Sequence, residues 1–466
     1  MTQYRKLIDH DIEVLNNICS PERVYTIDKI NADYSHDEMP EYGKFMPEVV
    51  VEIINSKEVS AIMKYAYENN IPVTPRGSGT GLCGGAVPIY GGILISLAKM
   101  NRILELDEEN LTVTVEAGVL LMDLIEYVSE HKLLYPPDPG EKSATIGGNI
   151  MTNAGGMRAV KYGVTRDYIM EITAVLPNGE ITKFGGKTTK NSSGYSLKDL
   201  IIGSEGTIAI VTEAVLKLIP KPKVVMSLLV PFKDLDACIN TVPKIIRSKA
   251  VPTAMEFMQR EVIEAAEEYL GKKFPDKSSD AYLLLTFDGS SRDEIERIYE
   301  DVADICLEAG AVDVFISDTE ERQESIWNAR GVFLEAIKSS TPSMDECDVV
   351  VPRNRIVEYV KHVNTLEKQY DVRIRSFGHA GDGNLHVYLC KDNLEDDVWK
   401  LRCSKIMKSL YDKAIELGGQ VSGEHGIGHA KMPYLKESIG NMQISLMEGI
   451  KRVFDPKNVL NPGKII

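Results

Sequence analysis

The sequence predicts a protein of the α+β class with more than one domain. First, its 466 residues exceed the roughly 100 to 200 residues of a typical compact domain, so two or three domains are expected. Second, the N-terminal half combines glycine-rich segments with strand-like runs. Third, after residues 219–225, "IPKPKVV", the glycines thin out and helical and strand-like stretches alternate. We therefore expect a domain boundary at that segment.

The N-terminal half begins with a helical pattern and continues with strands. Its first 45 residues are expected to form a helical lead-in, because apolar residues recur there at roughly helical spacing. Residues 47–77 predict a strand, a helix and a second strand, with Ser56 capping the helix. A β-hairpin is expected around Asn178-Gly179, since this dipeptide favours a tight two-residue turn.

The second half alternates strand-like and helical segments. Residues 281–289 and 311–319 are rich in apolar residues and are expected to form strands. The acidic stretch 292–308 between them is expected to form a helix. Another helix is expected over residues 401–419, ending at its pair of glycines.

The composition excludes several classes of protein. A net charge of −16 argues against binding to nucleic acid, which requires a concentrated basic surface. The apolar runs are far shorter than the ~20 residues of a membrane span, and the N-terminus lacks the apolar core of a secretory signal. The 7 cysteines include no closely spaced pair, so we expect reduced thiols, a cytoplasmic location and no iron–sulfur cluster in this chain.

The first glycine-rich loop, "PRGSGTGLCGGAVP" at residues 75–88, predicts an anion-binding site. A Rossmann fingerprint would need a helix directly after the glycines, and residues 83–88 cannot begin one. Successive backbone N–H groups of such a loop can point into one concavity that suits a pyrophosphate. Glycines that only build turns are the alternative. Two further glycine-rich segments, at 136–163 and 194–213, favour one long ligand with a diphosphate and flat rings.

Two histidine-containing motifs in the second half predict a metal site. In "RSFGHAGDGNLHVYL", His379 and His386 flank a predicted chain reversal and can face one point. In "SGEHGIGH", Glu424 stands beside His425. Two histidines and a carboxylate are the ligand set of catalytic zinc sites and of non-haem iron sites. Purely structural turns are the alternative.

Four motifs together resemble one known family. They are "PRGSGTGLCGGAVP", "PPDPGEKSATIGGNIMTNAGG", "GSEGTIAIVTEAVLKLIPKP" and the C-terminal "NPGK". They resemble the FAD-linked oxidases of the vanillyl-alcohol-oxidase or PCMH type, the group that contains D-lactate dehydrogenases and the catalytic subunit of glycolate oxidase. The resemblance implies a two-part FAD-binding domain, an inserted α+β cap domain for the substrate, and a C-terminal segment that returns to the flavin. The implied domains are 1–45 (the lead-in), 46–222 (FAD-binding), 223–415 (cap) and 416–466 (C-terminal segment).

The resemblance also implies which residues contact the flavin. They are Arg76, Gly77, Ser78, Gly79, Thr80, Gly84, Gly85, Pro137, Ser143, Ala144, Gly147, Gly148, Asn149, Asn153, Gly155, Gly156, Gly163, Glu205, Gly206, Ile210 and Asn461. Some relatives attach the flavin to a histidine in the first glycine loop. No histidine stands there in this chain, so we expect FAD to bind without a covalent link.

Relatives with "HxGDGNxH" followed by "GEHG" are metal-assisted 2-hydroxyacid dehydrogenases. By resemblance, His379, His386 and Glu424 bind one divalent metal, which is Zn, Fe or Mn, and His425 is the base. A metal on the substrate hydroxyl would lower its pKa, so that a histidine can take the proton while a hydride goes to flavin N5. Arg330, in "ESIWNARGVFLEA", matches the family's arginine for the substrate carboxylate.

The expected reaction is the oxidation of a D-2-hydroxyacid, with D-lactate to pyruvate favoured. Arg76 is the competing candidate for the substrate carboxylate. Dicarboxylate-specific relatives tend to carry a lysine where this chain has Glu346 and Cys347, so a monocarboxylate is favoured over 2-hydroxyglutarate. A glycolate oxidase catalytic subunit and a D-2-hydroxyglutarate dehydrogenase are the alternative functions. Electrons would pass to an electron-transferring flavoprotein or an iron–sulfur subunit, and quinone is disfavoured because no basic amphipathic segment is present. A hydrolase or oxygenase with the same metal ligands, and a non-enzymatic flavin subunit, are the competing classes.

Overall fold

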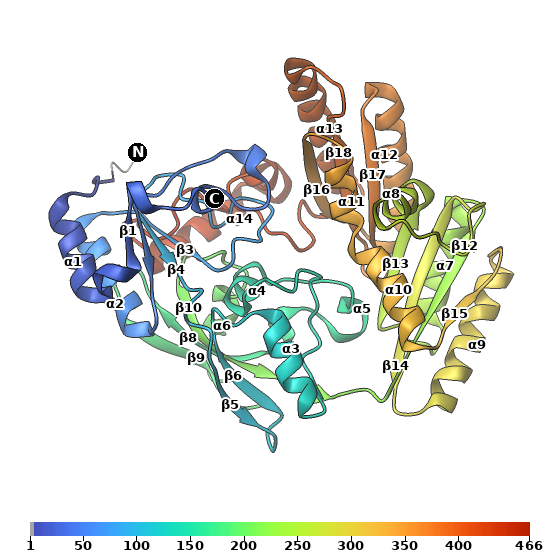
Figure 1. Cartoon of the computed structure of the whole chain (residues 1–466), viewed down its shortest axis with the longest axis horizontal. Coiled ribbons are helices and arrows are strands. Elements are labelled where there is room, and N and C mark those ends of the chain that lie inside the picture. The colour runs from blue at the N-terminus through green and yellow to red at the C-terminus, as the bar shows by residue number, and fades with distance from the viewer. Residues whose placement is uncertain (1–3) are drawn as a thin grey trace. The chain divides into compact units, whose positions relative to one another are not determined.

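The computed structural model describes residues 4–466, and Figure 1 traces them from blue at the N-terminus to red at the C-terminus. The chain divides into two compact units. Among the described residues, unit 1 comprises residues 4–154, Val164–Lys221 and His425–Ile466, and unit 2 comprises Gly155–Gly163 and Pro222–Glu424. Over residues 4–466, no helix combines the length and the apolar character that a membrane span needs.

The first sheet of unit 1 has four strands in the order β1-β2-β4-β3. Strands β2, β4 and β3 run parallel, and β1 is antiparallel to β2. Helices α1 and α2 contribute buried residues to the core of this sheet. The elements are α1 (Asp9–Cys19), β1 (Val24–Thr26), β2 (Val49–Glu52), α2 (Ser56–Asn69), β3 (Val73–Arg76) and β4 (Ile93–Ser96).

The predicted strand, helix and strand within residues 47–77 are confirmed as β2, α2 and β3. The predicted cap is wrong by one residue. Asn55 caps α2, because its side chain accepts hydrogen bonds from the backbone N–H groups of Lys57 and Glu58. Ser56 is already helical, and its hydroxyl donates to Thr212 Oγ1 instead.

The helical lead-in expected over the first 45 residues ends at Cys19. Short 3₁₀ turns follow, two of which begin at Pro21 and Pro40, and proline cannot continue a helix because it lacks the backbone N–H. Between these turns, Val24–Thr26 pairs with Val49–Val51 as an edge strand. The lead-in is therefore part of unit 1 and only partly helical.

The second sheet of unit 1 is antiparallel and has five strands in the order β5-β6-β10-β8-β9. The hairpin predicted around Asn178-Gly179 is confirmed, since Val175 pairs with Ile181 across it. The strands are β5 (Ile103–Asp107), β6 (Thr112–Glu116), β8 (Ile169–Val175), β9 (Ile181–Gly185) and β10 (Ile210–Lys217). The other elements of unit 1 are α3 (Leu121–Glu130), β7 (Leu133–Leu134), α4 (Ile146–Thr152), α6 (Leu197–Ile201), β11 (Ile219–Pro220) and α14 (Met432–Phe454).

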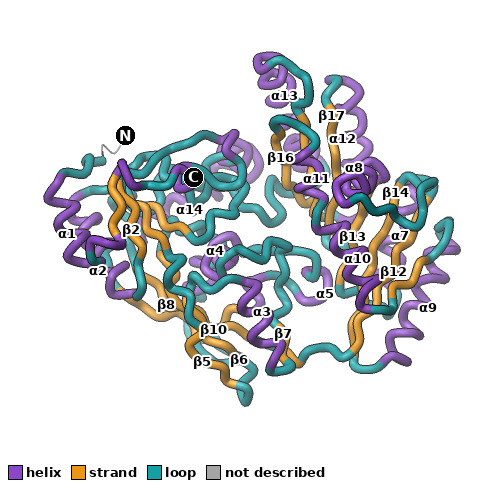
Figure 2. Tube along the Cα trace, in the orientation of Figure 1, coloured by secondary structure: helices purple, strands orange, loops and turns teal. Residues whose placement is uncertain are grey.

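Unit 2 is built on an antiparallel sheet of seven strands in the order β15-β12-β14-β13-β17-β18-β16, with helices alongside (Figure 2). The strands are β12 (Val224–Phe232), β13 (Ala254–Gln259), β14 (Ala281–Gly289), β15 (Phe315–Ser317), β16 (Met344–Val350), β17 (Arg373–His379) and β18 (Asn384–Cys390). The helices are α5 (Ala159–Tyr162), α7 (Leu235–Arg247), α8 (Arg260–Leu270), α9 (Arg292–Glu308), α10 (Glu320–Gly331), α11 (Phe333–Ser339), α12 (Ile356–Tyr370) and α13 (Asp396–Glu416).

The sequence predictions for unit 2 agree with the structure in most elements. Strand β14 and helix α9 have the predicted bounds. Strand β15 covers only three residues of the predicted 311–319, because it is a short edge strand that pairs with Ser227–Leu229 alone. The helix predicted over 401–419 begins five residues earlier, at Asp396.

Candidate active site

The β17–β18 hairpin brings two histidines together. His379 ends β17 and pairs with Asn384, while His386 lies in β18 and pairs with Phe377. The two histidines are therefore diagonal neighbours on one face of the hairpin. Their ring centroids lie 5.3 Å apart with the planes at 89°, and both side chains are buried. The predicted chain reversal between them is confirmed.

Glu424 completes a three-residue cluster within unit 2. Its Oε1 lies 3.4 Å from His379 Nε2 and 3.2 Å from His386 Nε2. One ligand atom from each of the three residues lies within 4.8 Å of the others. The structure brings together the three residues that were expected to bind a metal. His425, the expected base, follows Glu424 directly and begins the last segment of unit 1.

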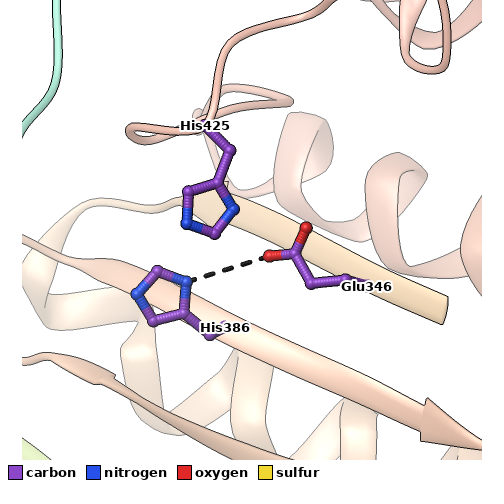
Figure 3. Close-up of side chains that lie close together, drawn as sticks. All are labelled: Glu346, His386 and His425. Atoms are coloured by element: carbon purple, nitrogen blue, oxygen red, sulfur yellow. Dashed lines mark ion pairs between the residues drawn. The ribbon is translucent and has the colours of Figure 1, made fainter. Parts of the chain in front are cut away.

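Further carboxylates surround the cluster. Glu256, Glu346 and Asp348 are fully buried, at 0% exposure. Glu256 Oε1 lies 2.7 Å from His379 Nδ1, and Glu346 Oε1 lies 3.9 Å from His386 Nδ1 (Figure 3). Burial of several negative groups is unfavourable unless positive charge accompanies them. The donor atoms and the charge of this site therefore fit a divalent cation.

Neighbouring carboxylates and burial both shift pKa values at this site. Burial alone would lower the pKa of His379, but the attraction of Glu256 and Glu424 outweighs it and raises this pKa well above its ordinary value. Burial raises the pKa of Asp382, in the turn of the hairpin, to about 6. A site that attracts a proton so strongly also attracts a metal ion, which would take the proton's place on a histidine.

Asp348, on β16, fixes the backbone that carries Glu424. Its Oδ2 accepts hydrogen bonds from Ser422 Oγ at 2.8 Å, from Gly423 N at 3.0 Å and from Glu424 N at 3.2 Å. Its Oδ1 accepts from Asn384 Nδ2 at 2.6 Å. One buried carboxylate therefore ties the histidine hairpin to the segment that supplies the third member of the cluster.

Sequence reasoning missed Glu256 and Asp348. Each interrupts an otherwise apolar strand, "AMEFMQ" for β13 and "MDECDVV" for β16. A charged residue in a buried strand is rare without a partner, and this was the signal in the sequence. The partners could not be deduced, because they depend on which strands are neighbours in the sheet.

Arg330, the expected ligand of the substrate carboxylate, lies on α10 and is buried. Its Nε and Nη2 donate to Glu256 Oε2 at 2.9 and 2.7 Å. Its guanidinium carbon lies 4.5 Å from the centre of the Phe377 ring, a cation–π contact. Because Glu256 also contacts His379, one carboxylate links Arg330 to the cluster of His379, His386 and Glu424.

Arg76, the competing candidate, belongs to unit 1 and supports a loop. Its Nη1 donates to the carbonyl oxygen of His36 at 2.7 Å, and its Nη2 donates to that of Asp33 at 3.0 Å. Burial lowers the pKa of Arg76. A Cβ at Gly79 would lie 2.0 Å from Arg76 Nη2, so the side chain packs directly against the first glycine loop.

The first two glycine-rich segments meet within unit 1. Ser78 Oγ donates to the carbonyl oxygen of Ser143 at 2.7 Å. A Cβ at Gly77 would lie 2.2 Å from Thr145 Oγ1, so only glycine fits there. Thr145 in turn accepts a hydrogen bond from Gly148 N at the start of α4. The loops that were expected to hold the diphosphate therefore lie side by side.

The C-terminal segment joins these loops. Asn461 Nδ2 donates to the carbonyl oxygens of Gly85 and Glu205, both at 2.8 Å. The Glu205 carboxylate accepts from the backbone N–H groups of Ile427 and Gly428 at 2.7 and 2.6 Å. Three expected flavin contacts from distant parts of the sequence are thus brought together in unit 1.

Two buried polar atoms beside these loops fit a polar ligand such as FAD. The ring of His429, a residue not predicted for the flavin site, lies against the first loop, since a Cβ at Gly84 would be 2.4 Å from it. In the part of the chain that the structure describes, His429 Nε2 and Asn461 Oδ1 are buried without a hydrogen-bond partner. Burial lowers the pKa of His429 to about 4. Buried polar atoms are normally bonded, so a ligand at this position would explain them.

The remaining expected flavin contacts divide between the units. Gly155, Gly156 and Gly163 fall in unit 2, where the segment that contains them contacts β13 and where Lys161 pairs with Asp288. The others fall in unit 1, namely Thr80, Pro137, Ala144, Gly147, Asn149, Asn153, Gly206 and Ile210.

Comparison with known proteins identifies the family. Residues 47–185 match the FAD binding domain family, and residues 221–465 match the family described as FAD linked oxidases, C-terminal domain. A D-lactate dehydrogenase of Anaerostipes hadrus is 53% identical over 99% of this chain and 98% of its own. Glycolate oxidase subunit GlcD of Bacillus subtilis is 42% identical over 98% of this chain and 97% of its own.

The fold agrees with these matches. The structure of p-cresol methylhydroxylase with substrate bound superposes with a TM-score of 0.81 at 17% identity, over 98% of this chain and 96% of that one. This likeness confirms the predicted PCMH-type fold, with its two-part FAD-binding domain. The chain belongs to the FAD-linked oxidase family. It is an FAD-containing oxidoreductase, as its sequence motifs predicted.

Proposed function

We propose that this oxidoreductase uses FAD and one divalent metal to oxidise a D-2-hydroxyacid. The favoured reaction is the oxidation of D-lactate to pyruvate. The observation that carries the proposal is the cluster of His379, His386 and Glu424 among buried carboxylates, with Arg330 beside it. A cation site next to a buried arginine suits a substrate that has both a hydroxyl group and a carboxylate. The relative named D-lactate dehydrogenase supports this choice of substrate.

Each residue has a distinct part in the proposed reaction. When bound, FAD supplies the hydride acceptor and the metal supplies a Lewis acid at the substrate hydroxyl. The two histidines and Glu424 would hold the metal. Arg330 would bind the substrate carboxylate and so orient the substrate, and His425 would take the hydroxyl proton. The first glycine loop contains no histidine, so we propose that FAD is held there without a covalent bond.

The charge around the cluster favours a monocarboxylate. Glu346 is fully buried and lies 3.9 Å from the His386 ring, which places a negative group beside the site. A second carboxylate on the substrate would be repelled by it. We therefore favour D-lactate over D-2-hydroxyglutarate. Glycolate is the second candidate, because the Bacillus subtilis relative is a glycolate oxidase subunit.

Electrons from the reduced flavin would pass to a second protein. The 7 cysteines are buried and scattered along the chain, and within residues 4–466 they form no disulfide and offer no ligand set for an iron–sulfur cluster. We propose an electron-transferring flavoprotein or an iron–sulfur subunit as the acceptor. A cytoplasmic location, where such thiols stay reduced, belongs to the same proposal.

Anaerobic reduction of the bound flavin by a panel of D- and L-hydroxyacids tests the proposal. We expect D-lactate to bleach the visible flavin absorbance, and L-lactate to leave it unchanged, because one orientation of C2 is fixed by the carboxylate and the metal. Mixing the reduced protein with candidate carriers then identifies the acceptor. A flavin that none of the hydroxyacids reduces would contradict the proposal and favour a hydrolase, an oxygenase or a supporting flavin subunit.

A further inference from the structure

Glu256 divides its two carboxylate oxygens between two parts of the proposed site. It lies in the middle of β13, where Leu284 and His379 are its neighbours on either side in the sheet. Its Oε1 is 2.7 Å from His379 Nδ1, and its Oε2 accepts from Arg330 Nε at 2.9 Å and Nη2 at 2.7 Å. The carboxylate is fully buried at 0% exposure. Both partners are therefore held by one group that does not reach solvent.

The contact with His379 determines which ring nitrogen is available to a ligand. Because a carboxylate accepts, His379 donates from Nδ1, and its Nε2 is the atom that faces Glu424 at 3.4 Å. Carboxylates that accept from the outer nitrogen of a metal-binding histidine fix its ring orientation and raise its affinity for the metal.

The contact with Arg330 orients the guanidinium group in the same way. A guanidinium has donors on three nitrogens, and Glu256 engages only Nε and Nη2. The stacking of the same group at 4.5 Å over Phe377 fixes its plane. The Nη1 end is not part of this ion pair and is left for a substrate carboxylate.

Stability alone does not account for a glutamate at this place. A buried ion pair contributes little net stability compared with well-packed apolar residues, and the neighbours of Glu256 in β13 are the apolar Met255 and Phe257. Apolar residues in place of both Glu256 and Arg330 would pack as stably, but nothing would then orient His379 and no guanidinium would remain for a substrate.

We propose that Glu256 is a positioning residue that couples the metal site to the site for the substrate carboxylate. Its carboxylate orients the ring of His379 for the metal and the guanidinium group of Arg330 for the substrate. Removal of this carboxylate should therefore weaken metal binding and substrate binding together. The inference rests on the proposed function and adds a residue that acts on substrate and metal at once.

The test compares Glu256→Gln with Glu267→Gln in the flavin-loaded protein. Glu267, on α8, is a similarly buried carboxylate of unit 2, and it accepts hydrogen bonds from Arg260, Lys273 and the backbone N–H of Phe274, none of which belongs to the cluster. In Glu256→Gln the amide accepts only through its oxygen, so one partner faces an N–H group and the other keeps a hydrogen bond to an uncharged acceptor, and both contacts are weakened. We expect a roughly 10- to 100-fold weaker affinity for Zn²⁺ or Mn²⁺, measured by chelator competition, which is the loss typical for such partners of metal ligands.

A second readout separates positioning from a general loss of stability. In Glu256→Gln the KM for D-lactate should rise together with the metal dissociation constant, while the FAD content stays that of the wild type, since most of the expected flavin contacts belong to unit 1. Glu267→Gln should lower the melting temperature and leave metal affinity and KM unchanged. If Glu256→Gln does not fold, Glu256→Asp keeps the charge, and its shorter side chain should weaken metal binding and raise KM to a smaller degree.

The outcomes distinguish this inference from the proposed function. Wild-type metal affinity and KM in Glu256→Gln, or in Glu256→Asp where that variant is used, would overturn the role of Glu256 and leave the metal-dependent reaction intact. A wild-type protein that binds no divalent cation would overturn both. Equal losses of metal affinity in the Glu256 and Glu267 variants would also overturn the inference, because the effect would then be one of stability.

Discussion

At the scale of single residues, the cluster of His379, His386 and Glu424 depends on side chains that are not members of it. Asp348 is the best example, since four donors converge on its carboxylate and three of them belong to the segment Ser422–Glu424. Each buried donor that loses its acceptor is left unsatisfied at a cost of about 1–3 kcal/mol. The position of Glu424 is therefore set by Asp348 as much as by its own contacts.

Asp348→Asn should lower both stability and metal affinity. The amide has one acceptor oxygen in place of two, so we expect about 1–3 kcal/mol less free energy of unfolding in urea and a metal affinity at least about tenfold weaker. Asp276→Asn is the matched control, since Asp276 accepts from Ser279 N at 3.0 Å and from Tyr282 Oη at 2.7 Å, and neither donor belongs to the cluster. Asp276→Asn should lower the free energy of unfolding and leave the metal affinity unchanged. Unchanged metal binding in Asp348→Asn would show that Asp348 does not position Glu424.

The sequence predicted part of this residue-level picture. His379, His386 and Glu424 could be found because they stand in two compact motifs with turn-forming glycines. Glu256 and Asp348 could not, since each lies on a different strand and meets its partners only through the order of strands in the sheet.

At the scale of secondary structure, the turn of the β17–β18 hairpin places the histidines. Gly383 has φ +92°, which residues other than glycine rarely adopt, and a Cβ there would lie 2.0 Å from the carbonyl oxygen of Val351. The turn therefore requires glycine for two independent reasons, its backbone conformation and the close approach of another strand end.

Gly383→Ala should weaken metal binding and lower stability more than a substitution that introduces backbone strain alone. Gly310 is a matched control with φ +97° and no described atom within 4 Å of the position that a Cβ would take, so Gly310→Ala should cost only the left-handed strain of about 1–2 kcal/mol. Gly383→Ala adds a clash with backbone, so its urea midpoint should fall further and its metal affinity should drop. Equal effects of the two substitutions on stability and on metal binding would contradict the role given to this turn.

Regular elements with strong patterns were predicted well, and those set by long-range pairing were not. The elements β2, α2, β3 and α9 follow from local periodicity and composition. The edge strand β1 does not, because it forms only by pairing with β2 after a helix and several turns. A three-residue strand carries too little pattern to be distinguished from a loop.

At the scale of the whole molecule, the chain is an FAD-linked oxidase of two compact units. Most of the residues expected to contact FAD lie in unit 1, and the His379, His386 and Glu424 cluster lies in unit 2. The fold class followed from motifs that span both. The assignment of segment 155–163 to unit 2 could not be predicted, because it depends on contacts with β13 and Asp288, which are remote in the sequence.

The central claim, that the reaction needs a metal at this cluster, is tested most directly by removing the metal from the flavin-loaded protein. The protein is treated with a strong chelator, checked for retained FAD and mixed anaerobically with D-lactate. We expect flavin reduction to slow by about 100-fold or more, because Lewis-acid stabilisation worth several kcal/mol is lost, and to recover when Zn²⁺ or Mn²⁺ is added. Reduction at the original rate in metal-free protein would contradict the claim.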